Sequence, residues 1–211
     1  MKSIKLVLFD KDGVLIDSMK NDMLAYNVML VKFGKKSLSK KEYMKSCWGP
    51  SEEDCLKNAF GIIFMRKRKE LLDYYHKKRI DLIKYTKVYP NVKRVLKKLK
   101  SEGYGTGVIT STETKTAEKI LRGIGLAKYF DIIIGGDIAK PKPAPDPILK
   151  ACKIFGVKPS ETAYIGDNIE DVMAGKAAGC LTIAITNSHP RNYLKKADVV
   201  IKDVKEVLDL V

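Results

Sequence analysis

The 211-residue sequence predicts an α/β protein with a doubly wound parallel sheet and an inserted all-helical domain. Three observations lead to this fold class. Ile4–Phe9 is an apolar run closed by a glycine turn, as in a strand buried on both faces. Residues 17–86 have a helical pattern without a strand-like interruption. From Tyr104 onward strand-like and helix-like segments alternate, which is typical of a parallel sheet covered by helices.

Two aspartates, Asp10 and Asp12, follow the first predicted strand. Residues two apart in an extended stretch project to the same side, and parallel sheets bind ligands at the carboxyl ends of their strands. Two carboxylates that close repel one another, so one takes up a proton unless a cation lies between them. The segment is therefore either a plain polar turn or part of a cation-binding site.

The next segment predicts helices only. Four are expected: one that ends near Gly34, then Ser39–Cys47, Ser51–Phe60 and Phe64–Lys84. Asn91 is expected to cap a further helix over Val92–Leu99. We therefore expect a core domain of residues 1–16 and 87–211, and an inserted helical domain of residues 17–86.

The rest of the chain alternates. Strands are expected at Tyr104–Thr110, Phe130–Ile134, Thr162–Ile165, Leu181–Ile185 and Val199–Ile201. Helices are expected at Thr114–Arg122, from Asp146 on, at Ile169–Ala178 and at Val204–Leu210. Asp146 has the position of a side-chain cap and Pro147 that of the first helical residue.

Composition indicates a globular protein, with 45% apolar and 31% charged residues. No apolar run has the length of a membrane span, and the chain enters its first strand without room for a signal peptide. The cysteines have neither zinc-site nor disulfide-framework spacing. We expect a cytoplasmic protein with reduced thiols and no membrane partner. The two histidines, His76 and His189, are isolated and are expected at the surface.

The formal net charge is +15, and Arg66–Lys100 alone holds fourteen Lys or Arg against three Asp or Glu. A basic block is consistent with nucleic-acid binding. Within it, however, Val92–Leu99 has the apolar spacing of one helix face, which makes its lysines a solvated face. A lysine-rich, glutamine-free surface is also typical of heat adaptation. We therefore favour the solvated face over a nucleic-acid partner.

Three later segments place polar groups where they can join Asp10. Thr110 and Ser111 follow the second core strand, where they either cap the next helix or donate to a phosphoryl oxygen. Lys140 and Lys142 lie in a proline-rich turn, where both could simply be exposed surface charges. Asp167 follows a strand, which brings it to the same edge of the sheet as Asp10. Asp171 lies three residues after Asn168, as in a capping box, or belongs to the acidic site.

Together these segments resemble the four motifs of the haloacid dehalogenase superfamily, in its phosphatase branch with a helical cap inserted after the first motif. Phe9–Ser18, Val108–Ser111, Lys140–Pro147 and Ile165–Asp171 are similar to motifs one to four, in order. The resemblance covers the core domain end to end. It implies a Rossmann-like catalytic core and identifies residues 17–86 as the cap domain.

The resemblance implies a role for each motif residue. Asp10 would be the nucleophile that forms an aspartyl-phosphate, and Asp12 the general acid and base. The phosphoryl group would be bound by Thr110, Ser111 and Lys142, since Lys142 has the family's register and Lys140 ranks second. Mg²⁺ is the implied metal because the ligands are hard oxygens. Those ligands would be the Asp10 carboxylate, the Asp12 backbone carbonyl and the Asp167 carboxylate, with Asp171 beside the metal or bound to it.

The implied substrate is a small phosphorylated metabolite, of the phosphoglycolate type or related to it. β-Phosphoglucomutase-like proteins are an alternative, but they have an arginine where this chain has Glu52, which is also a favourable first-turn residue of a helix. The cap residues nearest that position, including Trp48, are expected to lie in the cap core or to line the pocket. A basic nucleic-acid-associated protein on the same fold is a further alternative. The expected state is a monomer or a homodimer.

Overall fold

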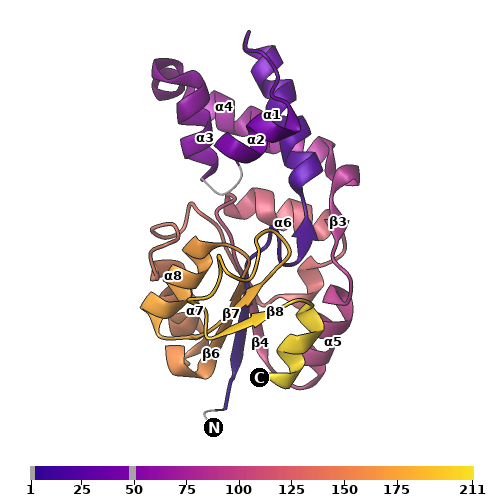
Figure 1. Ribbon diagram of the computed structural model, residues 1–211, viewed down its shortest axis with the longest axis vertical. Coiled ribbons are helices and arrows are strands. Elements are labelled where there is room, and N and C mark those ends of the chain that lie inside the picture. The colour runs from indigo at the N-terminus through magenta and orange to yellow at the C-terminus, as the bar shows by residue number, and fades with distance from the viewer. Residues whose placement is uncertain (1–2, 48–50) are drawn as a thin grey trace. The chain divides into compact units, whose positions relative to one another are not determined.

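The computed structural model describes residues 3–47 and 51–211, and the chain divides into two compact units. The first contains the residues up to Asp17 together with Val88–Val211, and the second is Ser18–Lys87 (Figure 1). Both junctions lie one residue from the predicted boundaries. Trp48, Gly49 and Pro50 lie outside the described residues. The structure therefore does not test the prediction that Trp48 lies in the cap core or lines the pocket.

The first unit, the core unit, is built on a six-stranded sheet in which each strand is parallel to its neighbours. The strand order is β5-β4-β1-β6-β7-β8. The strands are β1 (Leu6–Phe9), β4 (Gly105–Ile109), β5 (Ile132–Ile134), β6 (Thr162–Gly166), β7 (Leu181–Ile185) and β8 (Val199–Ile201). A separate two-stranded sheet pairs β2 (Ile16–Asp17) with β3 (Lys87–Val88). The predicted doubly wound parallel sheet is confirmed.

The strand order places β1 between β4 and β6. After β1 the chain adds β4 and β5 on one side of it, and then β6, β7 and β8 on the other. Such a reversal of strand order is where ligands bind in open parallel sheets, at the carboxyl ends of the strands. All four residues of β1 are fully buried, as their apolar sequence predicts. The fold therefore brings the segments after β1, β4 and β6 to one place.

Helices cover both faces of the sheet (Figure 1). The core unit has α5 (Val92–Ser101), α6 (Thr114–Gly123), α7 (Asp146–Phe155) and α8 (Ile169–Ala178). Short 3₁₀ turns occur at η2 (Ala127–Tyr129), η3 (Pro159–Glu161) and η4 (Val204–Asp209). The terminal helix is therefore of the 3₁₀ type. It packs with α5, while α7 and α8 pack together.

Asn91 is the N-cap residue of α5 as predicted, but its side chain makes no cap hydrogen bond; the residue is left-handed, and its side-chain amide donates to Asp203 Oδ2 at 2.8 Å. The predicted side-chain cap of α7 is wrong. Asp146 lies inside the first turn of α7, and Pro145 occupies the N-cap position without a side-chain bond. At Asn91 the side chain bonds a partner distant in sequence and not the helix. At Asp146 the helix already begins at the aspartate, so this residue cannot be its N-cap.

The second unit, the cap unit, is all helical between its ends. It contains α1 (Met19–Lys32), α2 (Lys40–Ser46), α3 (Glu52–Phe60), α4 (Ile62–Asp81) and the 3₁₀ turn η1 (Ile83–Tyr85). Ser39 caps α2 in a reciprocal capping box with Glu42, and the Ser51 hydroxyl caps α3 by accepting from the Asp54 amide. Helix α4 begins two residues before its predicted start.

An aromatic cluster forms the centre of the cap unit. Tyr26 makes edge-to-face contacts with Tyr43 and Tyr75, with ring centroids 5.7 and 6.1 Å apart. Leu56 and Leu71 are fully buried in the same cluster. Because this core is separate from that of the sheet, the inserted segment has its own hydrophobic basis for folding.

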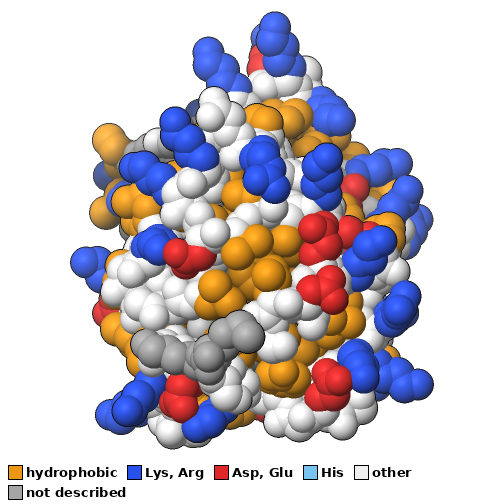
Figure 2. Space-filling view, turned by 60° about the horizontal axis from the view of Figure 1, so that its bottom comes forward, with side chains coloured by type: hydrophobic (Ala, Val, Ile, Leu, Met, Phe, Trp, Pro, Cys, Tyr) orange, Lys and Arg blue, Asp and Glu red, His pale blue; other side chains and the backbone are white. Residues whose placement is uncertain are grey.

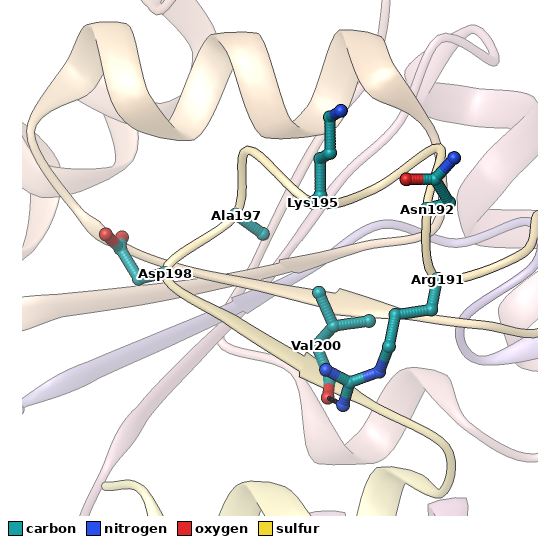
Figure 3. A pocket seen from close by; sticks show the side chains of 6 residues that line it. All are labelled: Arg191, Asn192, Lys195, Ala197, Asp198 and Val200. Carbon is teal, nitrogen blue, oxygen red and sulfur yellow. Dashed lines mark hydrogen bonds between the residues drawn. The ribbon is translucent and has the colours of Figure 1, made fainter.

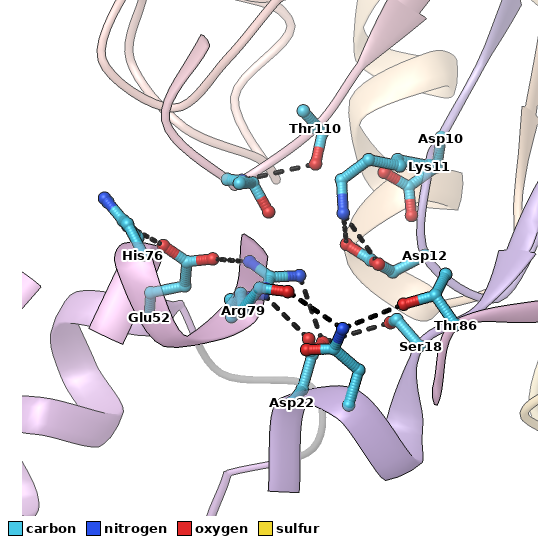
Figure 4. Close-up of polar contacts among 12 residues, drawn as sticks. Asp10, Lys11, Asp12, Ser18, Asp22, Glu52, His76, Arg79, Thr86 and Thr110 are labelled. Carbon is cyan, nitrogen blue, oxygen red and sulfur yellow. Dashed lines mark hydrogen bonds and ion pairs between the residues drawn. The ribbon is translucent and has the colours of Figure 1, made fainter. Parts of the chain in front are cut away.

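A charged cluster is also buried in the cap unit, around Arg79 (Figure 4). The Arg79 side chain is 2% exposed; its Nε lies 2.7 Å from Asp22 Oδ1, and Nη1 donates to Glu52 Oε1. His76 Nε2 is 2.8 Å from the other oxygen of Glu52. His76 is therefore buried, and the prediction of a surface position is wrong. No sequence pattern around His76 indicated that Glu52, in α3, would be its partner.

We expect Arg79→Ala to lower the free energy of unfolding by about 3–5 kcal/mol, because it leaves two carboxylates buried without their cation. Arg68→Ala is the matched control. Arg68 pairs with Glu53 at the surface, where such a pair contributes up to about 1 kcal/mol. Urea unfolding followed by circular dichroism measures both variants. Equal losses would contradict the stabilising role of the buried cluster.

Candidate active site

Three predicted site residues follow three adjacent strands of the core unit. Asp10 follows β1, Thr110 follows β4 and Asp167 follows β6. The register pairs Phe9 of β1 with Val108 of β4 and Ile165 of β6, so the strands end at similar heights. The Asp10 amide also donates to the Ile165 carbonyl at 2.8 Å.

Three carboxylates meet at this edge of the sheet. Asp10, Asp167 and Asp171 are all buried, and one oxygen from each lies within 4.8 Å of the others. Burial raises the pKa of Asp10 to about 7 against the attraction of Lys142, and the Asp171 and Asp12 charges add to the rise. Burial, followed by the charges of Asp171 and Asp10, also raises the pKa of Asp167 well above its ordinary value. The cluster therefore has too little positive charge to remain ionised easily.

Lys142 is the internal cation of this cluster. Its Nζ lies 2.9 Å from Asp10 Oδ1 and 2.6 Å from Asp171 Oδ1, and its side chain is 9% exposed. Burial works against its charge, but Asp10 and Asp171 outweigh it and hold the pKa of Lys142 well above its usual range. Lys140, the second candidate, is exposed. The proline-rich turn thus brings Lys142 to the cluster.

Four donors occupy the oxygens of Asp171. Oδ1 accepts from Lys142 and from the buried Tyr164 hydroxyl at 2.7 Å. Oδ2 accepts from the backbone N–H groups of Asp167 and Asn168, each at 3.2 Å. Asn168 completes the capping box of α8, as its sequence predicts. Asp171 therefore both caps the helix and positions Lys142.

Lys11 holds the side chain of Asp12 (Figure 4). Its ammonium lies 2.7 and 2.6 Å from the two carboxylate oxygens, and its own side chain is fully buried. Sequence reasoning assigned no role to Lys11, because a lysine in a polar turn is expected at the surface. A lysine between two acids was the available signal.

The loop after β7 supports the turn that contains Asp10, Asp12 and Gly13. No sequence pattern pointed to this contribution of the loop. Asn187 Nδ2 donates to the Gly13 carbonyl at 2.8 Å, and the Ser188 hydroxyl hydrogen-bonds Asp167 and opposes the rise of its pKa. Gly13 has φ +76°, and a Cβ there would lie 1.8 Å from Asp167 Oδ2. The close approach of the turn to Asp167 therefore requires glycine.

Thr110 is buried, and its Oγ1 accepts from the Thr112 amide at 3.2 Å. Ser111 is exposed. Helix α6 begins only at Thr114, with Glu113 at the N-cap position. The alternative that Thr110 and Ser111 cap this helix is therefore wrong. Both hydroxyls remain candidates for a ligand at the strand end.

A surface depression of about 510 Å³ lies elsewhere in the core unit (Figure 3). It is lined by Arg191, Asn192, Lys195, Ala197, Asp198 and Val200. Arg191 donates to the Val200 carbonyl at 2.6 Å, and Asp198 pairs with Lys176 at the same distance. Because its charged groups are largely engaged and none of the acidic cluster lines it, this depression is not the catalytic centre.

The acidic cluster fits a divalent cation. Asp10 and Asp167 supply carboxylate oxygens, the donor type that Mg²⁺ prefers, and neither histidine nor cysteine belongs to the cluster. A cation there would offset the repulsion that raises the pKa of both carboxyls. Asp171 fits less well as a direct ligand because its oxygens already accept four hydrogen bonds.

Comparison with known proteins gives a consistent result. The family model for haloacid dehalogenase-like hydrolases matches residues 7–185. A phosphoglycolate phosphatase from Aquifex aeolicus is 34% identical over 85% of this chain and 83% of its own length. A candidate pyrophosphatase, PpaX, from Clostridium perfringens is 34% identical over 99% of this chain and 97% of its own. The crystal structure of a predicted phosphoglycolate phosphatase from Haemophilus somnus is 26% identical, with a TM-score of 0.84 over 100% of this chain and 99% of that one.

We expect Gly13→Ala to destabilise the protein more than Gly179→Ala, by about 1–3 kcal/mol. Both glycines are left-handed, with φ of +76° and +81°, so alanine strains the backbone similarly at each. At Gly13 the methyl group also collides with Asp167, whereas nothing lies within 4 Å at Gly179. Urea unfolding of both variants measures the difference. Equal destabilisation would mean that the turn can move away from Asp167 at no cost.

Proposed function

This chain belongs to the haloacid dehalogenase-like hydrolase family and is a phosphatase, and we propose that it hydrolyses a small phosphomonoester through an aspartyl-phosphate on Asp10. The observation that carries the proposal is the buried cluster of Asp10, Asp167 and Asp171, in which Lys142 contacts Asp10 and Asp171. Phosphoryl transfer depends chiefly on positioning and on charge stabilisation. The cluster has the groups for both.

Asp10 is the proposed nucleophile. Lys142 contacts its Oδ1 and fixes the orientation of the carboxylate. In the first step an Asp10 oxygen bonds to phosphorus as the bond to the leaving oxygen breaks, and Asp12 gives that oxygen a proton. In the second step Asp12 takes a proton from water, whose oxygen bonds to phosphorus as the bond to Asp10 breaks. Phosphate leaves and both carboxyl groups are restored.

Mg²⁺ is the proposed metal, held by the Asp10 and Asp167 carboxylates and by the backbone carbonyl of Asp12. When bound, it supplies positive charge that stabilises the phosphoryl oxygens and offsets the carboxylate repulsion. Because the oxygens of Asp171 are occupied, its proposed role is to position Lys142 and not to bind the metal directly.

Lys142 and the hydroxyl groups after β4 are proposed to bind the phosphoryl group. The Lys142 ammonium neutralises charge that develops on its oxygens in the transition state. The buried Thr110 and the exposed Ser111 offer hydroxyl donors at the end of the neighbouring strand. These groups recognise the transferred group alone, so the choice of substrate must come from elsewhere in the protein.

A small monophosphate is the proposed substrate class. Relatives named phosphoglycolate phosphatase support it. Glu52 supports it too, because its carboxylate is paired with Arg79 and His76 inside the cap unit and offers no cation to a second phosphate. The mutase alternative, which depends on an arginine at that position, is therefore disfavoured.

The contacts of the basic block Arg66–Lys100 favour the interpretation that its lysines are a solvated surface and not a nucleic-acid site. Several lysines of the block pair with acids one helical turn away, including Lys69 with Asp73 and Lys77 with Asp81. On the face shown in Figure 2, Lys and Arg side chains are scattered among acidic and apolar ones.

Among the described residues there is no helix of the length and apolar character needed to cross a membrane. We propose that the enzyme works in the cytoplasm, where free thiols stay reduced.

Removal of divalent cations should abolish the hydrolysis of p-nitrophenyl phosphate, and added Mg²⁺ should restore it. Mg²⁺ should also raise the Tm of the wild-type protein, because it relieves repulsion among the carboxylates. Asp167→Asn should lose most of this Tm rise, which can be measured without turnover. Undiminished hydrolysis in EDTA would contradict the metal assignment.

A panel of phosphoglycolate, sugar phosphates, nucleotides and pyrophosphate tests the substrate class. The highest kcat/KM is expected for a small monophosphate, with no interconversion of β-glucose 1-phosphate and glucose 6-phosphate. Asp10→Asn is the control and should be inactive toward every compound. A preference for pyrophosphate would refute the substrate class, and efficient interconversion would refute the assignment as a hydrolase.

A further inference from the structure

Tyr164 is a buried polar residue to which the proposed reaction assigns no role. It lies in β6, between Leu8 of β1 and Thr182 of β7 in the register of the sheet, and it is fully buried. Its ring belongs to the main apolar cluster of the core unit. A phenylalanine would fill nearly the same space, so the apolar packing does not require the hydroxyl group. The hydroxyl group therefore has a role other than packing.

The Tyr164 hydroxyl group and Lys142 share one oxygen of Asp171. The hydroxyl donates to Asp171 Oδ1 at 2.7 Å, and Lys142 Nζ lies 2.6 Å from the same atom. The other oxygen, Oδ2, accepts from two backbone N–H groups. Because both oxygens have donors, the carboxylate cannot turn without breaking hydrogen bonds to a charged group, which are strong ones. The direction in which Asp171 holds Lys142 is therefore fixed.

A close approach of α8 to β6 allows the hydrogen bond between Tyr164 and Asp171. A Cβ at Gly166, two residues after Tyr164 in the same strand, would lie 2.1 Å from the Cβ of Asp171. Glycine thus lets the first turn of α8 pack directly on the strand. Burial, followed by the charge of Asp171, holds the pKa of Tyr164 well above its usual range, so the hydroxyl group stays protonated and remains a donor.

A chain of contacts links this hydroxyl group to the proposed nucleophile. Lys142 Nζ lies between two carboxylates, 2.6 Å from Asp171 Oδ1 and 2.9 Å from Asp10 Oδ1. A hydrogen bond to Asp171 stabilises part of the negative charge of that carboxylate, which weakens its attraction for the ammonium. Without the hydroxyl group, Lys142 would be drawn toward Asp171 and away from Asp10. The position of the catalytic ammonium therefore depends on Tyr164.

We propose that Tyr164 is a positioning residue for phosphoryl transfer, whose hydroxyl group fixes Asp171 and thereby keeps the Lys142 ammonium beside Asp10. This inference rests on the proposed function, in which Lys142 neutralises charge that develops in the transition state. Loss of the hydroxyl group should therefore slow the chemical step more than it weakens substrate binding. A hydrogen bond with a structural role alone would affect stability and leave kcat unchanged.

Tyr164→Phe removes only the hydroxyl group and tests the proposal in the full-length enzyme. With p-nitrophenyl phosphate and saturating Mg²⁺, kcat should fall at least about tenfold, while KM should change less than about twofold. Tyr26→Phe is the matched control, because the buried Tyr26 hydroxyl donates to the Cys55 carbonyl at 3.0 Å in the cap unit. It also loses a buried hydrogen bond but should keep the wild-type kcat. Unchanged kcat in Tyr164→Phe, or an equal loss in Tyr26→Phe, would overturn the proposal.

A double-mutant cycle tests whether Tyr164 acts through Lys142. In a Lys142→Ala background, Tyr164→Phe should lower the residual kcat less than about twofold, because the ammonium that the hydroxyl group positions is gone. Losses that multiply in the double variant would refute this route. Tyr164→Met, which fills the space without a hydroxyl group, replaces Tyr164→Phe in both experiments if that variant does not fold.

Asp10→Asn distinguishes a failure of this inference from a failure of the proposed function. If Asp10→Asn retains activity, the proposed reaction is wrong, and the role of Tyr164 is wrong with it. If Asp10→Asn is inactive while Tyr164→Phe keeps the wild-type kcat, the reaction stands and only the role of Tyr164 is refuted. The inference predicts an inactive Asp10→Asn together with an impaired Tyr164→Phe.

Discussion

The burial of three carboxylates at one edge of the sheet is the constraint on which the site depends. Asp10, Asp167 and Asp171 lie together with Lys142 as their partner, so negative charge exceeds positive charge in a place that water hardly reaches. The Tyr164 hydroxyl and two backbone N–H groups stabilise Asp171. A divalent cation can neutralise the remaining excess of negative charge, and a phosphoryl group can then bind beside that cation.

The cap unit also contains carboxylates with little exposure to water, but there an arginine contacts them. Arg79 pairs with Asp22 and Glu52, and a Ser18 hydroxyl donates to Asp22 at 3.0 Å. In this cluster one guanidinium contacts both carboxylates directly. A closed ion cluster is consistent with a structural role, whereas the open acidic cluster of the core unit is consistent with catalysis. Chemistry and cap architecture therefore rest on separate charge centres.

Local patterns predicted most of the fold, because strands, helices and the caps at Ser39 and Asn168 depend on a few neighbouring residues. Asp10 and Asp167 could be expected together because parallel strands end at one edge, whereas Lys142 was expected beside them only from the resemblance to the family's third motif. What stayed hidden were partners distant in sequence. The contact of Asn91 with Asp203 spans 112 residues, and that of His76 with Glu52 spans 24. No local pattern reports such pairs.

The most direct test of the central claim is to trap the covalent intermediate. The enzyme is mixed with a substrate and Mg²⁺, quenched in acid during turnover and reduced with borohydride, which converts an acyl phosphate to a homoserine residue. Peptide mapping should then find homoserine at position 10, since Asp10 is the carboxylate that Lys142 orients in the buried cluster. Homoserine at another aspartate, or none during rapid turnover, would contradict the account.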